Sequence, residues 1–216
     1  MTSNPHFARK WIASAFAVLF VAGSLSTAYA ASPAEDFIQS NVSRGLGILN
    51  SGEPKEQKLT DFRSFLVQLT DLKRIALYTL GPAKNAAAPP DVTAFVDAFK
   101  DYAFAVYETE FQQYSGQTLK VTGSLQRSAG DYLVRTVLLD PHKSNGDPIK
   151  VDFRVMGDAG HFVVVDITVE GLDLAITEQD DFQAFLAEHN NNIKQLTDNL
   201  KQRAENVRST GQIKGN

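Results

Sequence analysis

The sequence contains no cysteine, so neither a disulfide bond nor a zinc–thiolate site supports this fold. Only four histidines occur, and no two of them have the spacing of metal ligands. A glycine-rich phosphate loop, a Gly-x-Ser-x-Gly turn and a basic stretch interleaved with aromatics are also missing. The formal net charge of −4, evenly mixed along the chain, argues against nucleic acid and against constant adhesion to anionic lipid surfaces. These absences give little support to metal-dependent or thiol-dependent catalysis.

The N-terminus has the three parts of a secretory signal peptide. Arg9 and Lys10 supply the positive charge, an apolar stretch of about a dozen residues follows, and small residues flank Tyr29. A membrane-spanning helix is the alternative, but it needs roughly 20 apolar residues, and this run ends sooner. We therefore predict that residues 1–30 are a signal peptide, that cleavage follows Ala30, and that the protein is exported to the periplasm.

The hydrophobic pattern divides the remainder of the chain into three parts. Apolar residues recur at helical spacing over 32–80 and again over 91–114, where the stripe is broad and strongly aromatic. The period changes to two over 119–169, which predicts four antiparallel strands. Helical spacing returns up to about residue 203, and a flexible polar tail is expected over 204–216. This order predicts an α+β domain, in which a curved four-stranded antiparallel sheet packs against N- and C-terminal helices.

Asp166 is the one suggestive acid, because it interrupts the otherwise apolar run 163–167. One interpretation is a general base whose pKa is raised in a pocket. The other is a structural acid that pairs with a basic side chain of the neighbouring strand, such as Arg154. The pattern favours the second interpretation, because buried acids in proteins usually have a partner.

The predicted helix 91–114 offers more apolar and aromatic surface than one face of a sheet needs. The surplus indicates either ordinary core or a cavity that accepts an apolar ligand. Periodicity cannot separate the two, because a side chain that faces a cavity has the same spacing as one that faces core.

Three stretches of the chain share a pattern with a known family. They are Phe65-x3-Leu69-x5-Ile75-x4-Leu80-Gly81, Phe95-x3-Phe99-x2-Tyr102-x4-Tyr107-x3-Phe111-x2-Tyr114-x-Gly116, and Val164-Val165-Asp166-Ile167-x-Val169-Glu170-Gly171-Leu172-x-Leu174 with Asp181-Phe182-x2-Phe185-Leu186 after it. Together they resemble the MlaC family of toluene-tolerance proteins, periplasmic phospholipid carriers that serve an ABC transporter. The resemblance extends from about Phe37 to Leu200, and the segment from Asp180 to His189 is also similar to HpnM, a branch associated with hopanoids.

The resemblance implies a nuclear transport factor-like sheet whose flanking helices enclose an apolar pocket over residues 31–203, a lipid-binding domain. It implies that acyl chains lie in this pocket and that the headgroup stays outside. The residues expected to line it are Phe65, Leu69, Ile75, Ala76, Leu80, Phe95, Phe99, Tyr102, Val106, Phe111, Val121, Val134, Val151, Phe153, Val163 and Val165.

The function implied by the resemblance is transport of phospholipid between an outer-membrane lipoprotein complex and an inner-membrane ABC transporter complex, which maintains outer-membrane lipid asymmetry. No enzyme activity, cofactor, metal or stable membrane insertion is expected. A hopanoid or other isoprenoid carrier of the same fold is one alternative, and a pocket enzyme that uses Asp166 is another.

Overall fold

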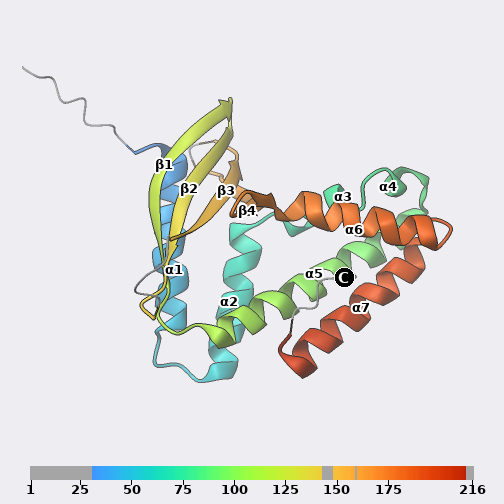
Figure 1. The fold of residues 1–216 in the computed structure, drawn as a ribbon, viewed down its shortest axis with the longest axis horizontal. Coiled ribbons are helices and arrows are strands. Elements are labelled where there is room, and N and C mark those ends of the chain that lie inside the picture. The colour runs from blue at the N-terminus through green and yellow to red at the C-terminus, as the bar shows by residue number, and fades with distance from the viewer. Residues whose placement is uncertain (1–30, 143–147, 159, 213–216) are drawn as a thin grey trace, which may run out of the picture. The chain divides into compact units, whose positions relative to one another are not determined.

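The structure, a computed structural model, describes residues 31–142, 148–158 and 160–212. The predicted signal peptide, residues 1–30, lies outside the described residues, so its cleavage stays a prediction. The elements follow one another as shown in Figure 1. In chain order they are α1 (Pro33–Leu49), α2 (Lys55–Leu69), α3 (Leu72–Thr79), α4 (Ala83–Ala86), α5 (Pro89–Gln113), β1 (Thr118–Ser128), β2 (Asp131–Leu139), β3 (Ile149–Met156), β4 (Val163–Val169), β5 (Leu172–Asp173), α6 (Leu174–Glu188) and α7 (Ile193–Thr210).

Local sequence signals explain where the helices begin. The side chain of Ser32 accepts a hydrogen bond from the backbone N–H of Glu35 at 3.2 Å, which caps α1. The longest helix, α5, begins at Pro89 rather than at the predicted residue 91, because proline is well suited to the first helical turn. Asp173 caps α6 by accepting the backbone N–H of Ile176 at 2.8 Å.

The five strands form one antiparallel sheet in the order β1-β2-β3-β4-β5. The α+β class is confirmed, but the prediction of four strands is wrong by one. The extra strand, β5, returns along β4 through a tight turn in which Glu170 and Gly171 both have positive φ, 50° and 85°. Two residues are too few to show a period of two, so the sequence pattern could not reveal this strand.

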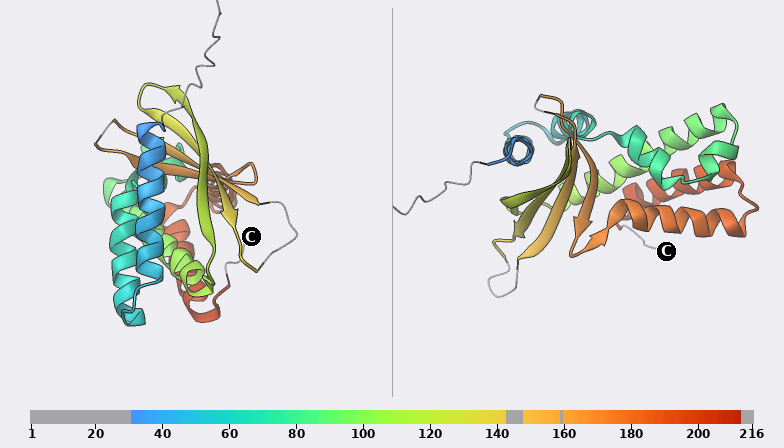
Figure 2. Two further views of the ribbon diagram at one scale, coloured as in Figure 1. Left: turned by 90° about the vertical axis from the view of Figure 1, so that its left-hand side faces the viewer. Right: turned by 90° about the horizontal axis from the view of Figure 1, so that it is seen from above.

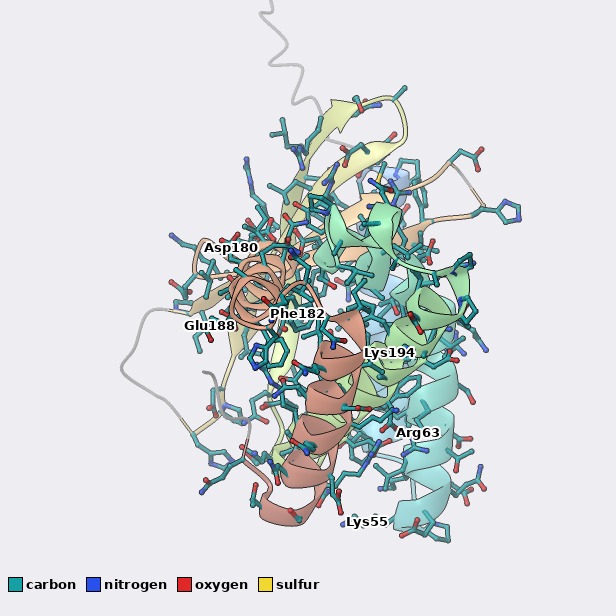
Figure 3. The ribbon with its side chains drawn as sticks, turned by 90° about the vertical axis from the view of Figure 1, so that its right-hand side faces the viewer. Lys55, Arg63, Asp180, Phe182, Glu188 and Lys194 are labelled. Atoms are coloured by element: carbon teal, nitrogen blue, oxygen red, sulfur yellow. The ribbon has the colours of Figure 1, made fainter. Side chains whose placement is uncertain are left out.

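The helices fall into two groups around the sheet (Figure 2). Helices α1 and α2 pack on each other and on the sheet, whereas α3, α5, α6 and α7 pack together beside β4. An ion pair between Arg63 of α2 (labelled in Figure 3) and Glu108 of α5 links the two groups. A site that lies between the groups therefore has β4 and α5 as its shared walls.

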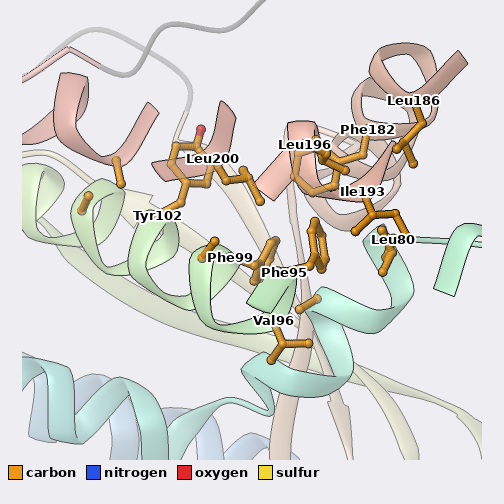
Figure 4. Packing of buried hydrophobic residues seen from close by; sticks show 14 of the residues in the cluster. Leu80, Phe95, Val96, Phe99, Tyr102, Phe182, Leu186, Ile193, Leu196 and Leu200 are labelled. Carbon is orange, nitrogen blue, oxygen red and sulfur yellow. The ribbon is translucent and has the colours of Figure 1, made fainter. Parts of the chain in front are cut away.

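Each group has its own apolar core. In the first, Ala34 and Ile38 of α1 meet Val134, Val155 and Val164 of the sheet. In the second, α5, α6 and α7 interlock around aromatic rings (Figure 4). The rings of Phe95 and Phe182 cross edge-on at 5.8 Å, and those of Phe99 and Phe182 cross edge-on at 6.4 Å, a favourable arrangement for aromatic pairs.

Helix α7 continues past the point at which a polar tail was expected. It runs to Thr210, with Ala204 and Val207 buried in the helical core, so the predicted boundary at residue 203 is wrong. The guanidinium of Arg208 also binds the carboxylate of Asp101 on α5 at 2.6 Å. Over 204–210 the apolar positions are a lone alanine and a lone valine among polar residues, and such a sparse stripe resembles a solvated end.

Candidate functional site

Two apolar cavities lie side by side at β4. The first, the α1–sheet cavity, has a volume of about 330 Å³ and the second, the α5–α6 cavity, about 270 Å³. Ligand pockets usually begin at about 300 Å³, so each cavity by itself is close to the lower limit. The α1–sheet cavity is lined by Ile38, Asn41, Val42, Gly45, Leu46, Leu49, Phe62, Phe65, Leu66, Leu69, Thr70, Tyr107, Tyr114, Gln117, Thr118, Leu119, Leu138, Phe153, Val164 and Ile167. The α5–α6 cavity is lined by Thr70, Ile75, Thr79, Phe99, Tyr102, Ala103, Val106, Tyr107, Val164, Asp166, Ile167, Leu174, Ala175, Thr177 and Glu178.

Four residues line both cavities and form the wall between them: Thr70, Tyr107, Val164 and Ile167. Thr70 is held there by a parallel bridge to Val164, beside a backbone hydrogen bond from Asp71 N–H to the Val164 carbonyl at 3.3 Å. Tyr107 is partly buried, and both cavities border it. Burial, with a smaller contribution from the charge of Asp166, raises the pKa of the Tyr107 hydroxyl.

A bulge in β4 decides which of its side chains face the cavities. The pairing steps from Arg154↔Asp166 to Val155↔Val164, so Val165 is the extra residue. Val164 and Ile167 therefore share the inner face, although they are three residues apart. Val163 and Val165 line neither cavity, because the bulge breaks the alternation from which their positions were predicted. Their contact with lipid stays a prediction.

Other predicted residues do line a cavity. Phe65, Leu69 and Phe153 line the α1–sheet cavity, and Ile75, Phe99, Tyr102 and Val106 line the α5–α6 cavity. Six of these side chains lie on helices, and Phe153 lies on β3. Their contact with lipid stays a prediction.

The remaining predicted residues line neither cavity. Ala76, Leu80 and Phe95 are buried in the helical core. Val134 belongs to the core beneath α1, and Val121 and Val151 pack against that core. Phe111 lies outside the α1–sheet cavity, with its ring 5.1 Å from that of Phe62. The sequence pattern could not separate these residues from those that line a cavity, because core and cavity side chains have the same periodicity. Their contact with lipid stays a prediction.

Sequence reasoning missed the contribution of α1. Ile38, Val42, Leu46 and Leu49 line one side of the α1–sheet cavity. Their helical spacing is visible in the sequence, but the pattern only shows that α1 has an apolar face. It does not show that this face borders a cavity rather than packed side chains.

Asp166 borders the α5–α6 cavity and ties β4 to the start of α6. Its Oδ1 accepts the backbone N–H of Ile167 at 2.8 Å and that of Ala175 at 3.2 Å. Burial, followed by the hydrogen bond and charge of the neighbouring Asp173, raises the pKa of Asp166 to about 6. The predicted pairing with Arg154 is wrong, because the Arg154 guanidinium binds Asp131 at 3.0 and 3.1 Å.

A second acid of the α5–α6 cavity is Glu178 on α6. Burial raises the pKa of its carboxyl, and its Oε2 has no hydrogen-bond partner among the described residues. Across the part of the chain that the structure describes, no group of three metal-ligating side chains comes together. None of the helices in that part is long and apolar enough to cross a membrane.

Comparisons with known proteins agree with this architecture. The family model described as MlaC protein matches residues 39–202. A solved structure of a phospholipid-binding protein from Ralstonia solanacearum, in complex with a phospholipid, superposes with a TM-score of 0.68 at 21% sequence identity. The match covers 82% of this chain and 99% of the Ralstonia chain, so nearly all of that fold is present here.

Proposed function

Because this chain belongs to the MlaC family, we propose that it is a periplasmic carrier whose adjoining cavities hold the acyl chains of a glycerophospholipid. The observation that carries the proposal is the pair of cavities, lined mainly by aliphatic and aromatic side chains from five helices and the sheet. The phospholipid in the similar Ralstonia structure supports the choice of ligand.

Transfer free energies make such a carrier workable. Each buried methylene group contributes about 0.8 kcal/mol, so acyl chains alone give high affinity without specific headgroup contacts. The same energy makes spontaneous release into water very slow. A carrier therefore needs partners that accept the lipid, and we propose the inner-membrane ABC transporter complex and an outer-membrane lipoprotein complex of the family pathway. The signal-peptide pattern of residues 1–30 supports the periplasmic location.

Mass spectrometry of a solvent extract from purified, natively exported protein tests the proposal. We expect diacyl phospholipid close to one molecule per chain. Replacing Ile167, which lines both cavities, by tryptophan fills the space and lowers the lipid content. Ile176→Trp is the matched control, because Ile176 is 45% exposed and lines neither cavity.

Two results of this measurement would contradict the phospholipid proposal. A lipid-free extract from the wild-type protein would contradict the proposed carrier function. Stoichiometric triterpenoid in place of phospholipid would support the hopanoid alternative.

A pocket enzyme is the second candidate, because Asp166 borders an apolar cavity and has a pKa raised to about 6. We favour a binding protein, since Oδ1 of Asp166 already accepts two backbone N–H groups and the carboxyl faces Asp173. Asp166→Asn should leave the lipid content unchanged and alter the pH dependence of stability. Loss of a catalytic turnover in this variant, with its fold and lipid content intact, would favour the enzyme.

A further inference from the structure

A polar groove adjoins the α1–sheet cavity where α1 ends, α2 begins and α5 ends, three segments that meet in Figure 1. The groove has a volume of about 380 Å³. It is lined by Leu49, Glu53, Lys55, Lys58, Phe111, Gln112 and Tyr114. Leu49 and Tyr114 line the α1–sheet cavity as well, so the groove and the cavity share a wall.

The shared wall is apolar on the cavity side and polar on the groove side. Phe62 lines the cavity, and its ring lies 5.1 Å from that of Phe111 in the groove. The hydroxyl of Tyr114 accepts a hydrogen bond from Asn50 Nδ2 at 3.2 Å, while Tyr114 also borders the cavity. An amphiphile placed across this wall would have its chain in the cavity and its polar end in the groove.

Two lysines give the groove its positive charge. Lys55 Nζ donates to Gln112 Oε1 at 3.2 Å, and Lys58 Nζ donates to the Leu49 carbonyl at 3.1 Å. Both acceptors are neutral, and no carboxylate among the described residues lies within 4.0 Å of either ammonium group. Glu53 also lines the groove, so the two lysines outnumber its one acid. Figure 3 labels Lys55 at the start of α2.

The other cavity presents the opposite charge. Asp166 and Glu178 line the α5–α6 cavity, and Asp173 lies beside Asp166. A phosphate group placed there would be repelled by these carboxylates whenever they are ionised. The groove is therefore the more favourable place for an anion next to the paired cavities.

We propose that the groove holds the phosphate of the bound lipid, with the ammonium groups of Lys55 and Lys58 facing the phosphodiester. The assignment rests on the proposed carrier function and adds the place of the anionic phosphate in the complex, together with the two side chains that face it. Charge-assisted hydrogen bonds from the two lysines would then orient a ligand whose affinity comes mainly from its chains.

The test compares two lipids with identical fluorescent chains, phosphatidylglycerol and diacylglycerol, bound to lipid-free protein. Lys55→Glu/Lys58→Glu should weaken phosphatidylglycerol binding roughly tenfold and leave diacylglycerol binding unchanged. The matched control is Lys73→Glu/Lys84→Glu, a pair of exposed lysines on α3 and α4 that lines neither cavity. The control matches the tested pair in one further respect. Lys84 Nζ donates to the Leu77 carbonyl at 3.1 Å, just as Lys58 Nζ donates to the Leu49 carbonyl. The control variant should bind both lipids as the wild type does.

Equal phosphatidylglycerol affinity in the wild type and the groove variant would overturn the assignment. If the wild type bound both lipids in that case, the carrier function would stand and only the groove would be wrong; if it bound neither, the carrier function itself would fail. Should the double variant not fold, Lys55→Glu alone repeats the test, because Lys55 bonds only to the exposed side chain of Gln112. Calorimetry with inorganic phosphate tests whether the groove is instead a site for free phosphate. Tight binding of phosphate alone would overturn the lipid assignment, and the absence of such binding would support the lipid assignment.

Discussion

The carboxyl group of Asp166 accepts the backbone N–H of Ala175 in the first turn of α6 and also borders a cavity. Its pKa in the folded protein, about 6, exceeds the ordinary value of 3.8. The folded state therefore keeps a proton on this carboxyl at pH values where the unfolded state has lost it. It follows that the contribution of Asp166 to the unfolding free energy falls as pH rises from 3.8 to about 6.

Asp166→Asn should remove this pH dependence. Between roughly pH 4 and pH 7 the wild type should lose stability relative to the variant, as measured by urea unfolding at each pH. Asp131→Asn is the control with the opposite sign, because the hydrogen bond from Arg154 lowers the pKa of Asp131. Asp131 therefore stabilises the protein above its ordinary pKa, and that stability is lost as the pH falls. Parallel curves for the wild type and Asp166→Asn would contradict the assignment.

Substitutions of Phe95 and Leu46 test whether a core side chain and a cavity side chain differ in their effect on lipid binding. Phe95 is fully buried in the helical core and lines neither cavity. Phe95→Ala should cost about 3–5 kcal/mol of unfolding free energy while the folded protein keeps its lipid content. Leu46 lines the α1–sheet cavity, so Leu46→Ala should cost less stability and reduce bound lipid. If the Phe95 variant lost lipid at temperatures where it is fully folded, the assignment of Phe95 to the core and not to the lipid site would be contradicted.

At the scale of elements, α7 shows how a weak pattern can hide a packed helix. Its last two turns carry Ala204 and Val207 inward, and Arg208 binds Asp101 on α5. The chain continues as a helix there because α5 offers a long apolar face, which is a property of a different part of the sequence. A polar composition over 204–210 therefore did not mean a flexible segment.

Val207→Asp should destabilise the protein by about 2 kcal/mol or more, since it removes a buried apolar side chain and buries a charge. Ser209→Asp, at an exposed position of the same helix, is the control and should have little effect. Thermal unfolding of both variants measures the difference. Equal midpoints would show that the end of α7 contributes nothing to the fold.

The bulge in β4 explains why hydrophobic alternation assigned the wrong side chains of this strand to the inner face. Alternation from Val163 assigns Val165 and Ile167 to the inner face, whereas the extra residue puts Val164 there in place of Val165 and leaves Ile167 on that face. Pairing with β3 determines where the bulge lies, and a single strand carries no sign of it. Hydrophobic alternation could place β4 in the chain but could not orient it.

At the scale of the whole molecule, a ligand that fills both cavities should stabilise the fold. Ligand that binds only the folded state adds about 2.7 kcal/mol when its concentration is 100 times its dissociation constant. We therefore expect delipidated protein to unfold at a lower temperature than protein reloaded with phospholipid. Ile167→Trp should show a smaller shift than Ile176→Trp, because only Ile167 lines the cavities. The same shift in both variants would place the ligand elsewhere.

The sequence by itself determined the α+β class, the order of helices and strands, the family resemblance and the absence of thiol or zinc–thiolate chemistry. These properties follow from composition and from the spacing of apolar residues, which recur about every 3.6 residues in a helix and every second residue in a strand. Both spacings depend only on near neighbours in the chain. It also pointed to residues such as Phe65, Phe99 and Tyr102 that do line a cavity.

Only the tertiary structure decided which apolar side chains face space and which face one another. Phe95 and Phe99 lie one helical turn apart on α5 and both pack against Phe182 of α6, yet Phe95 is fully buried and only Phe99 lines a cavity. The partner of Asp166 and the position of Lys55 and Lys58 beside an apolar cavity were decided in the same way. Cavities and charge pairs arise between elements distant in sequence, so local patterns carry no record of them.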